Sequence, residues 1–376
     1  MIKKSFNWIL LLVMVLMLSG CRDQNQRAAK EIEELIAIQE AAVRGKNLES
    51  YMDTITLQND TYRAEKKSWM RDILLNDIED YHLRVKSIRM INAKEAKVEI
   101  QQDYSYNGGR YQVQYPLRIV QESQQWRDGD LFFERLDTEN FHIQYFSPSQ
   151  NYAVMIAAVC EEARENIVKR YGDDLIDQTI IKIYQDRELL RQSVKLSFQW
   201  QFAGWYEYPE SIKTTEFRDE ETYRMIIEHE LLHKLTIQES NNNLPYWFSE
   251  GLAVFFSNMP NEPASRYTKE EYLENYGEDV RTIKALETIN LETLAEEREI
   301  SNYYDSAGMI VKFMVERFGL EKVKEIIKML GQYPYQEGTG AEINQRAIIR
   351  FREVLSKVLG ITVEQLDQAW QENLRI

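Results

Sequence analysis

Between residues 82 and 136 the chain alternates apolar and polar side chains over four successive runs. Alternation with a period of two is typical of β-strands that bury one face. Asn107, Gly108 and Gly109 separate the second run from the third, and these residue types tolerate the positive φ angles of a tight hairpin turn. The pattern therefore predicts a meandering antiparallel sheet with strands over residues 82–91, 94–106, 110–120 and 124–136.

Helical periodicity precedes this sheet. One amphipathic helix is predicted from residue 32 to Gly45, and a second around residues 66–78. Helices followed by a long antiparallel sheet make an α+β domain, which we assign to residues 31–138. In its layout this domain resembles the cone-shaped, curved-sheet fold of nuclear transport factor 2-like and cystatin-like domains. The apolar positions of the first helix are Ile32, Leu35, Ile36 and Val43.

A different order of elements begins near Phe141. A strand over residues 141–146, a helix over residues 149–171 closed by Gly172, and a strand over residues 179–184 follow one another. The chain after about Pro260 is mostly helical, and 376 residues are too many for one ordinary core. We therefore predict a second domain, residues 139–376, with a small mixed sheet and a helical C-terminal body. Its later helices are expected at residues 303–318, 320–330, 343–359 and 362–374.

The N-terminal residues have the pattern of a secretion signal. Lys3 and Lys4 precede an apolar run of about 13 residues, which is shorter than the roughly 20 residues of a comfortable membrane span. The sequence Leu-Ser-Gly-Cys that ends at Cys21 resembles the lipobox of bacterial lipoproteins, in which the cysteine is acylated. This implies a signal peptide over residues 1–20, a tether over 21–30, and a lipid-anchored protein on the extracytoplasmic face of the cell membrane. A plain secretory signal or an uncleaved anchor is the alternative.

The charge and the cysteine content limit the partners and the stabilising bonds. The formal net charge is -15, and it becomes -17 once Lys3 and Lys4 are removed with the signal. Such a charge excludes nucleic acid as a partner and disfavours an anionic membrane surface, so attachment has to come from acyl chains. Cys160 is the only cysteine besides Cys21, and its apolar helical surroundings predict a buried, inert thiol.

Two of the four histidines occur in the stretch EHELLH, residues 228–233. His229 and His233 are four residues apart, so on a helix they lie one turn apart on the same face and can meet one ion. Glu230 points near the same edge, where its carboxylate can reach a metal-bound water; this is the HExxH arrangement. Acids at residues 219–221 favour a helix start just before it. The alternative is a core helix whose histidines bind nothing.

The third ligand is expected to be a carboxylate. Zinc in a hydrolytic site takes three protein ligands and keeps one position open, and no histidine follows His233. Glu250 lies in the run LPYWFSEGLAVFF, where an acid among apolar residues carries a desolvation cost and needs a partner. Pro245 suits the first turn of a helix, so Glu250 is predicted to project from a second helix beside the first.

The segment HELLHKLT followed by LPYWFSEGLAVFF resembles the gluzincin metallopeptidases, and most closely the peptidase MA-like domains of bacterial surface proteins. The resemblance covers residues from about Phe141 to the C-terminus. It implies that His229, His233 and Glu250 bind Zn²⁺ and that Glu230 is the general base. Sixteen residues separate His233 from Glu250, which is fewer than in thermolysin-like and aminopeptidase-like gluzincins.

The same resemblance implies a tyrosine that donates a hydrogen bond to the oxyanion. In SNYYDSAGMIVKFMVERFG the family pattern puts this tyrosine at Tyr303, with Tyr304 as its neighbour, and a purely structural role is the alternative. The stretch around Trp200 and Trp205 is predicted to be an edge strand or lip; in gluzincins the matching strand pairs with substrate, although aromatic packing explains these residues equally well. His82 and His142 are expected to be structural or solvated.

The sequence is compatible with two functions. The resemblance implies a membrane-anchored zinc metallopeptidase that hydrolyses a peptide or protein substrate. The rival is a non-catalytic surface lipoprotein whose cone-like domain binds a wall or protein partner, with a structural or relic metal site. Structural zinc sites usually close all four positions with cysteine or histidine, and no fourth ligand of that kind is evident.

Overall fold

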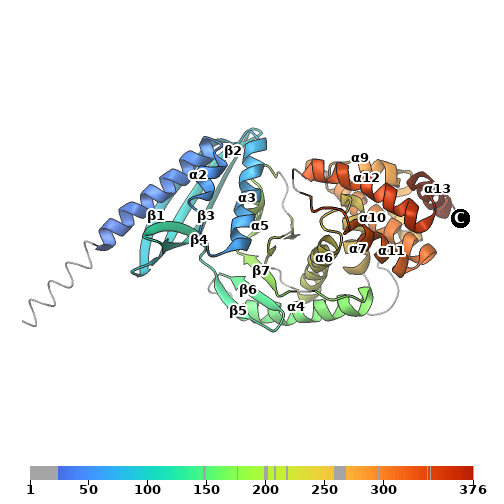
Figure 1. Cartoon of the computed structure of the whole chain (residues 1–376), viewed down its shortest axis with the longest axis horizontal. Coiled ribbons are helices and arrows are strands. Elements are labelled where there is room, and N and C mark those ends of the chain that lie inside the picture. The colour runs from blue at the N-terminus through green and yellow to red at the C-terminus, as the bar shows by residue number, and fades with distance from the viewer. Residues whose placement is uncertain are drawn as a thin grey trace, which may run out of the picture. The chain divides into compact units, whose positions relative to one another are not determined.

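The computed structural model describes ten segments of the chain and divides them into two compact units (Figure 1). The first unit comprises the described residues up to Phe133 together with Arg191–Ser197, and the second comprises Glu134–Leu190 and the described residues from Phe198 onward. The predicted lipidation site Cys21 and the apolar run before it lie outside the described residues. The described segments are residues 24–146, 150–175, 177–198, 202–206, 209–216, 219–257, 268–294, 296–336, 338 and 340–375.

The first unit confirms the predicted helices and antiparallel sheet. A helix over residues 24–44 is followed by α2 (Leu48–Met52) and α3 (Asp60–Leu75). Four antiparallel strands follow in the order β1-β2-β3-β4. Asn107 and Gly108 both have positive φ, 49° and 77°, and connect Tyr106 to its partner Gly109, which confirms the hairpin turn. The strands are β1 (Glu79–Asn92), β2 (Glu95–Tyr106), β3 (Gly109–Glu122) and β4 (Gln125–Leu131).

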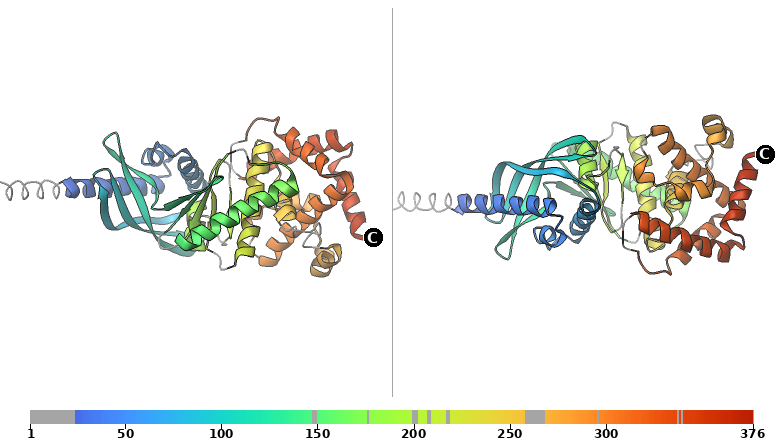
Figure 2. Two further views of the ribbon diagram at one scale, coloured as in Figure 1. Left: turned by 90° about the horizontal axis from the view of Figure 1, so that it is seen from below. Right: turned by 90° about the horizontal axis from the view of Figure 1, so that it is seen from above.

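The N-terminal helix is longer than predicted. Residues 24–30, expected as part of a tether, are helical and extend the helix whose later turns run along the sheet (Figure 2). Ala28 is buried one turn before Ile32 and so continues the apolar stripe, while Arg27 Nε lies 2.9 Å from Glu31 Oε1. Within the described part of the chain, no helix has both the length and the apolar character needed to cross a bilayer.

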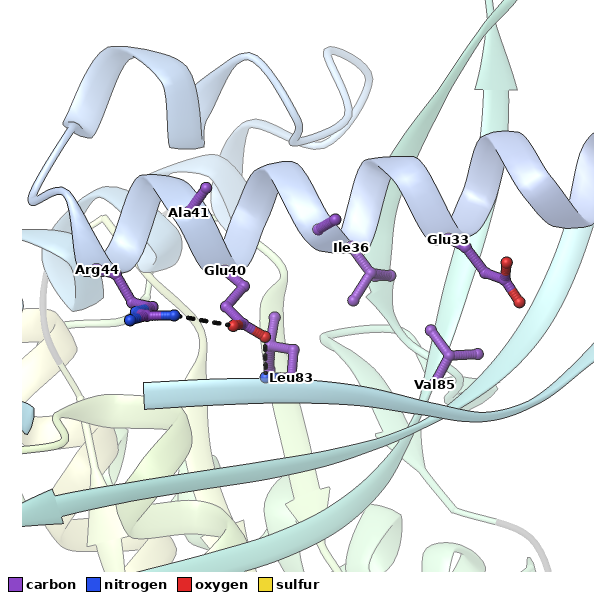
Figure 3. Close-up of a pocket in the computed structure, with 8 residues that line it drawn as sticks. Glu33, Ile36, Glu40, Ala41, Arg44, Leu83 and Val85 are labelled. Atoms are coloured by element: carbon purple, nitrogen blue, oxygen red, sulfur yellow. Dashed lines mark hydrogen bonds and ion pairs between the residues drawn. The ribbon is translucent and has the colours of Figure 1, made fainter. Parts of the chain in front are cut away.

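A groove separates the N-terminal helix from strand β1, which lies at one edge of the sheet (Figure 3). Glu40 reaches across it and accepts a hydrogen bond of 2.7 Å from the backbone N–H of Leu83. Its carboxylate also lies 3.6 Å from Arg44. Glu40 thus occupies one donor of an edge strand that could otherwise pair with another chain.

The strand predicted over residues 124–136 is two strands that belong to different sheets. Strand β4 ends at Leu131, and β5 (Glu134–Asp137) pairs antiparallel with β6 (Phe141–Tyr145), Glu134 opposite Tyr145. Because β5 belongs to the sheet of the second unit, the N-terminal stretch of the first unit runs to Phe133, whereas the sequence had suggested a boundary at residue 138.

The second unit is built on a small mixed sheet in the order β5-β6-β7-β9-β8. Strands β6, β7 (Thr179–Tyr184) and β9 (Ile212–Thr215) are parallel, whereas β5 and β8 (Gly204–Trp205) run antiparallel at the two edges. Helix α4 (Gln150–Tyr171) connects β6 to β7 and is followed by Gly172, whose φ of 90° ends the helix. The α+β class with a mostly helical C-terminal region is confirmed.

The helices of the second unit enclose one large hydrophobic core. Two of them carry the histidine motif and Glu250, and the helices after residue 268 cover them. Besides α4 and the short α5 (Arg187–Val194), which spans the boundary between the units, the helices of the second unit are α6 (Glu220–Glu239), α7 (Tyr246–Ser257), α8 (Lys269–Tyr276), α9 (Ile283–Thr288), α10 (Glu297–Phe318), α11 (Leu320–Leu330), α12 (Gly340–Leu359) and α13 (Val363–Arg375).

Candidate metal centre

The histidine motif lies in the middle of α6, as predicted. Asp219 caps this helix by accepting a hydrogen bond of 2.7 Å from Thr222 N. Two glutamates occupy the first turn, where their negative charges interact favourably with the helix dipole. Tyr223, Ile227 and Leu231 form an apolar stripe that is fully buried. The capped start and the buried stripe hold the helix firmly along its length.

Helix α7 carries the predicted third ligand. The carbonyl of Pro245 accepts a hydrogen bond of 3.0 Å from Phe248 N, so the proline marks the start of the helix. A Cβ on Gly251 would lie 2.5 Å from the carbonyl oxygen of Ala307 in α10. Only glycine permits this close packing of α7 on α10. The packing in turn determines where the neighbouring Glu250 lies.

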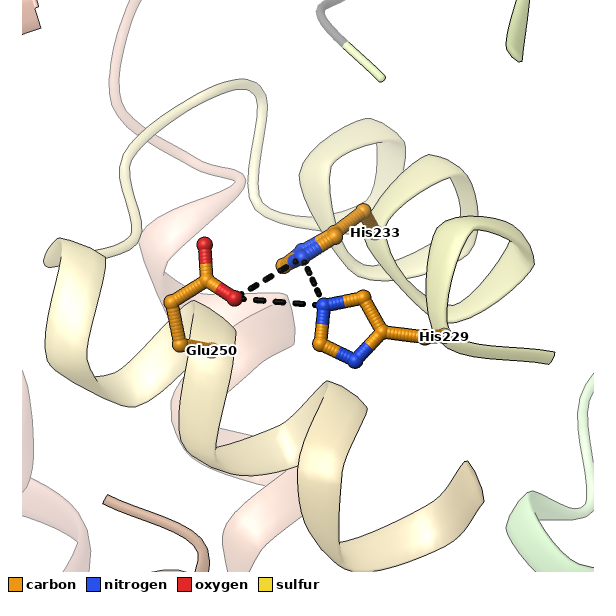
Figure 4. A group of neighbouring side chains, drawn as sticks. All are labelled: His229, His233 and Glu250. Carbon is orange, nitrogen blue, oxygen red and sulfur yellow. Dashed lines mark hydrogen bonds and ion pairs between the residues drawn. The ribbon is translucent and has the colours of Figure 1, made fainter. Parts of the chain in front are cut away.

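The two helices bring His229, His233 and Glu250 together (Figure 4). Both imidazole Nε2 atoms lie 3.2 Å from Glu250 Oε2, and they lie 3.0 Å from each other. Donor atoms about 2.0–2.1 Å from a tetrahedral zinc ion lie roughly 3.3 Å apart. The spacing of the three atoms therefore fits a small divalent cation.

The chemistry of the three atoms also fits a cation. Glu250 Oε2 is buried and, among the described residues, accepts no hydrogen bond of good geometry, although both Nε2 atoms are near it. Burial raises the pKa of Glu250, but the imidazoles of His233 and His229 outweigh this effect and hold the pKa well below its usual range. The carboxylate is therefore ionised at neutral pH, which is the form that binds a cation.

Ser249 orients one of the histidines. Its Oγ lies 3.0 Å from His233 Nδ1, and a ring that donates from Nδ1 presents a lone pair at Nε2. Ser249 is buried and directly precedes Glu250, so α7 contributes both a candidate ligand and the side chain that aligns another. Ser249 was not predicted from the sequence, although its position beside Glu250 in an apolar run was the available signal.

Glu228 fixes the motif helix from its other side. Its carboxylate is fully buried and accepts hydrogen bonds from Asn166 (2.8 Å), Arg170 (2.8 Å) and Arg224 (3.0 Å). Arg170 also donates to the carbonyl of Phe256 in α7 at 3.0 Å. This buried network links α4, α6 and α7, and therefore the two helices that carry the triad.

Glu230 lies on the same helix as the histidines and is almost completely buried. Burial is the main reason why the pKa of Glu230 rises to about 8; the His229 ring lowers it and the Glu250 charge raises it. A Cβ on Gly204 would lie 2.5 Å from Glu230 Oε1, so the backbone of the edge strand β8 passes directly beside this carboxylate.

The two adjacent tyrosines of α10 differ in their surroundings. Tyr303 is 1% exposed and belongs to the hydrophobic core. Tyr304 is partly exposed, and its ring centroid lies 6.2 Å from that of His229. Burial raises the pKa of both hydroxyls, and Glu250 adds to the effect on each; Glu230 adds to it only at Tyr304. Tyr304 is thus the one of the two whose ring lies near a candidate metal ligand.

The other singled-out side chains lie outside this cluster. His82 on β1 lies 3.1 Å from a Glu40 oxygen, and His142 on β6 lies 2.7 Å from an Asp137 oxygen. Cys160 is fully buried in α4, where burial raises the pKa of its thiol and keeps it protonated. The two histidines thus contact acidic side chains away from the triad, and Cys160 is buried, as predicted.

The aromatic stretch before the motif includes a short edge strand, as predicted. Trp205 lies in β8, the last strand of the sheet, and its ring centroid is 5.2 Å from that of Phe198 and 5.3 Å from that of Phe202. Aromatic packing thus accounts for Trp205, while the strand itself runs beside Glu230. Trp200 lies outside the described residues.

Comparisons with known proteins give no family. No protein-family model matches the chain, and no curated protein matches it. Among solved structures, the chain is similar to an NTF-2 like protein of unknown function from Shewanella oneidensis MR-1. The sequence identity is 16%, the alignment covers 27% of this chain and 93% of that chain, and the TM-score is 0.23.

Proposed function

We propose that this chain is a zinc-dependent peptide hydrolase of the gluzincin type, similar to the peptidase MA-like domains. The convergence of His229, His233 and Glu250 beside a buried Glu230 carries the proposal. Zinc held by the three side chains would supply Lewis acidity toward the scissile carbonyl and toward water. The substrates would be peptides or proteins outside the cytoplasm, as the predicted signal and the lipid anchor at Cys21 imply.

Glu230 is the proposed general base. It takes one proton from the attacking water as the new carbon–oxygen bond forms, and it returns this proton to the leaving amine as the carbon–nitrogen bond breaks. The carboxylate has to be ionised for the first step, whereas burial favours its neutral form. A divalent cation nearby favours the ionised form and so prepares Glu230 for this role.

Metal analysis and chelation test the proposal. The purified protein is expected to bind about one zinc per chain, and a chelator should abolish its cleavage of a peptide library until zinc is restored. The zinc content is measured by elemental analysis, and cleavage by mass spectrometry of the library. Cleavage that persists without metal, or zinc-loaded protein that cleaves nothing, would contradict the proposal.

Tyr304 is proposed to donate a hydrogen bond to the oxyanion of the tetrahedral intermediate. We expect Tyr304→Phe to lower kcat about 100-fold with little change in zinc affinity, because one preorganised donor is removed. Tyr303→Phe, on the adjacent core residue, is the matched control and should affect stability more than kcat. The opposite result would assign the role to Tyr303, as the family resemblance alone implies.

A further inference from the structure

The segment Arg191–Ser197 crosses from one compact unit into the other. It packs in the first unit, although the residues on both sides of it in the sequence belong to the second. Leu196 is completely buried in the same hydrophobic cluster as Trp69 and Tyr104 of the first unit. The first unit therefore holds this segment by burial as well as by polar contacts.

Three hydrogen bonds bind Gln192 and Leu196 of this segment to the first unit. Trp69 Nε1 donates to the carbonyl of Gln192 at 2.8 Å, and Gln102 Nε2 donates to the Gln192 side-chain oxygen at 2.8 Å. Tyr104 donates from its hydroxyl to the carbonyl of Leu196 at 3.0 Å. All three donors come from α3 or β2 of the first unit.

Both ends of the segment are also held. Arg191 Nη2 donates to the Tyr104 hydroxyl at 2.8 Å, and its guanidinium lies 4.5 Å from the centre of the Tyr111 ring. At the other end, Ser197 N donates to Asp72 Oδ2 at 3.0 Å. The Tyr104 hydroxyl therefore contacts both ends of the segment: it accepts a hydrogen bond from Arg191 and donates one to Leu196.

The residue after the segment, Phe198, packs against aromatic side chains on and beside strand β8. Phe198 follows Ser197 directly and packs in the second unit against Phe202 and Trp205, with ring centroids 5.4 and 5.2 Å away. Trp205 belongs to β8, whose other residue, Gly204, lies against the Glu230 carboxylate. One peptide bond thus joins a segment held by the first unit to aromatic rings packed on the strand beside Glu230.

We infer that the first unit acts as a clamp on Arg191–Ser197 that fixes β8 beside Glu230. Tyr104 and Asp72 are then positioning residues for hydrolysis, because they act through the clamped segment. The expected effect of the clamp on turnover rests on the proposed function, whereas its expected effect on the local stability of β8 does not depend on catalysis. It assigns to the N-terminal unit a role in arranging the site rather than in binding metal.

The test compares two tyrosine-to-phenylalanine variants of the full-length, zinc-treated protein. Tyr104→Phe removes the hydroxyl that contacts the clamped segment. Tyr62→Phe is the matched control, since it removes another buried hydroxyl of the first unit, which donates to Asp128 Oδ1 at 2.9 Å. We expect amide exchange in residues 202–206 to accelerate about tenfold in Tyr104→Phe only. In that variant kcat should fall by a similar factor with zinc affinity unchanged.

The rate of amide hydrogen exchange in residues 202–206 is sufficient to test the clamp. If Tyr104→Phe exchanges there at the rate of the parent and of Tyr62→Phe, the clamp does not exist. If no protein in the series cleaves peptides, the proposed function fails, and accelerated exchange in Tyr104→Phe alone would still support the clamp. Should Tyr104→Phe fail to fold, Asp72→Asn, which weakens the acceptor of Ser197 N, is compared with Tyr62→Phe in the same way.

Discussion

Glutamine in place of Glu230 is expected to lower kcat/KM for peptide hydrolysis by about 1,000-fold or more while zinc binding stays intact. The amide cannot accept the proton of the attacking water, and general-base catalysis typically contributes about 100- to 10,000-fold. Glutamine has nearly the same shape, so its packing beside Gly204 is retained. The measurement is kcat/KM on a fluorogenic peptide library, together with zinc affinity from competition with a chelator.

Glu239→Gln is the control for this prediction. Glu239 lies at the end of the same helix, where its carboxylate accepts a hydrogen bond of 2.8 Å from the Tyr171 hydroxyl. The same chemical change there should leave kcat/KM within a few-fold of the parent, since the residue does not contact the triad. A Glu230→Gln protein that binds zinc fully and cleaves as fast as the parent would exclude Glu230 as the base.

The parts of the fold that local sequence determines were predicted closely. Helix α11 was predicted at Leu320–Leu330 and is observed there, because Gly319, with a φ of 84°, and Gly331 bracket it. Strand β7 was predicted at Thr179–Tyr184 and is likewise observed there. In both elements the periodic pattern and its end signals lie within a few neighbouring residues, so no distant contact is needed to locate them.

Features that depend on distant contacts were missed. The sequence joined β5 to the first sheet because alternation continues through it, whereas its partner is β6. The placement of Arg191–Ser197 in the first unit depends on donors such as Trp69, more than a hundred residues away in the chain. Hydrophobic pattern alone does not specify which sheet a strand joins or which core a short segment enters.

The candidate site likewise combines features that local sequence determines with features that depend on distant contacts. The spacing of His229 and His233 within one helix was sufficient to place them together, since a helix fixes the geometry of residues four apart. Glu250 reaches them because Gly251 allows α7 to pack closely on α10, and the sequence predicted the helix but not this contact. Tyr303 and Tyr304 differ by one position, and only the packing of α10 shows which ring lies beside His229.

Alanine in place of Glu250 is expected to weaken zinc binding by more than about 100-fold. Changes to the residues that orient metal ligands typically cost 10- to 100-fold in affinity, and loss of a direct ligand should cost more. Ser249→Ala, which removes the partner of His233 Nδ1, should therefore fall between the parent and Glu250→Ala. Glu353→Ala, at an exposed acid of α12, should bind zinc as the parent does.

Stability measurements separate this ligand role from a structural one. Zinc bound only by the folded state raises the unfolding temperature by an amount that grows with the logarithm of its affinity, so the parent should show a zinc-dependent increase that Glu250→Ala lacks. Without zinc, the variant should lose only part of its stability, because the ion pairs of Glu250 with the two histidines are offset by the cost of burying its charge. An equal zinc-dependent increase in both proteins would show that Glu250 is not a ligand, and a large loss of stability without zinc would show that its role is structural.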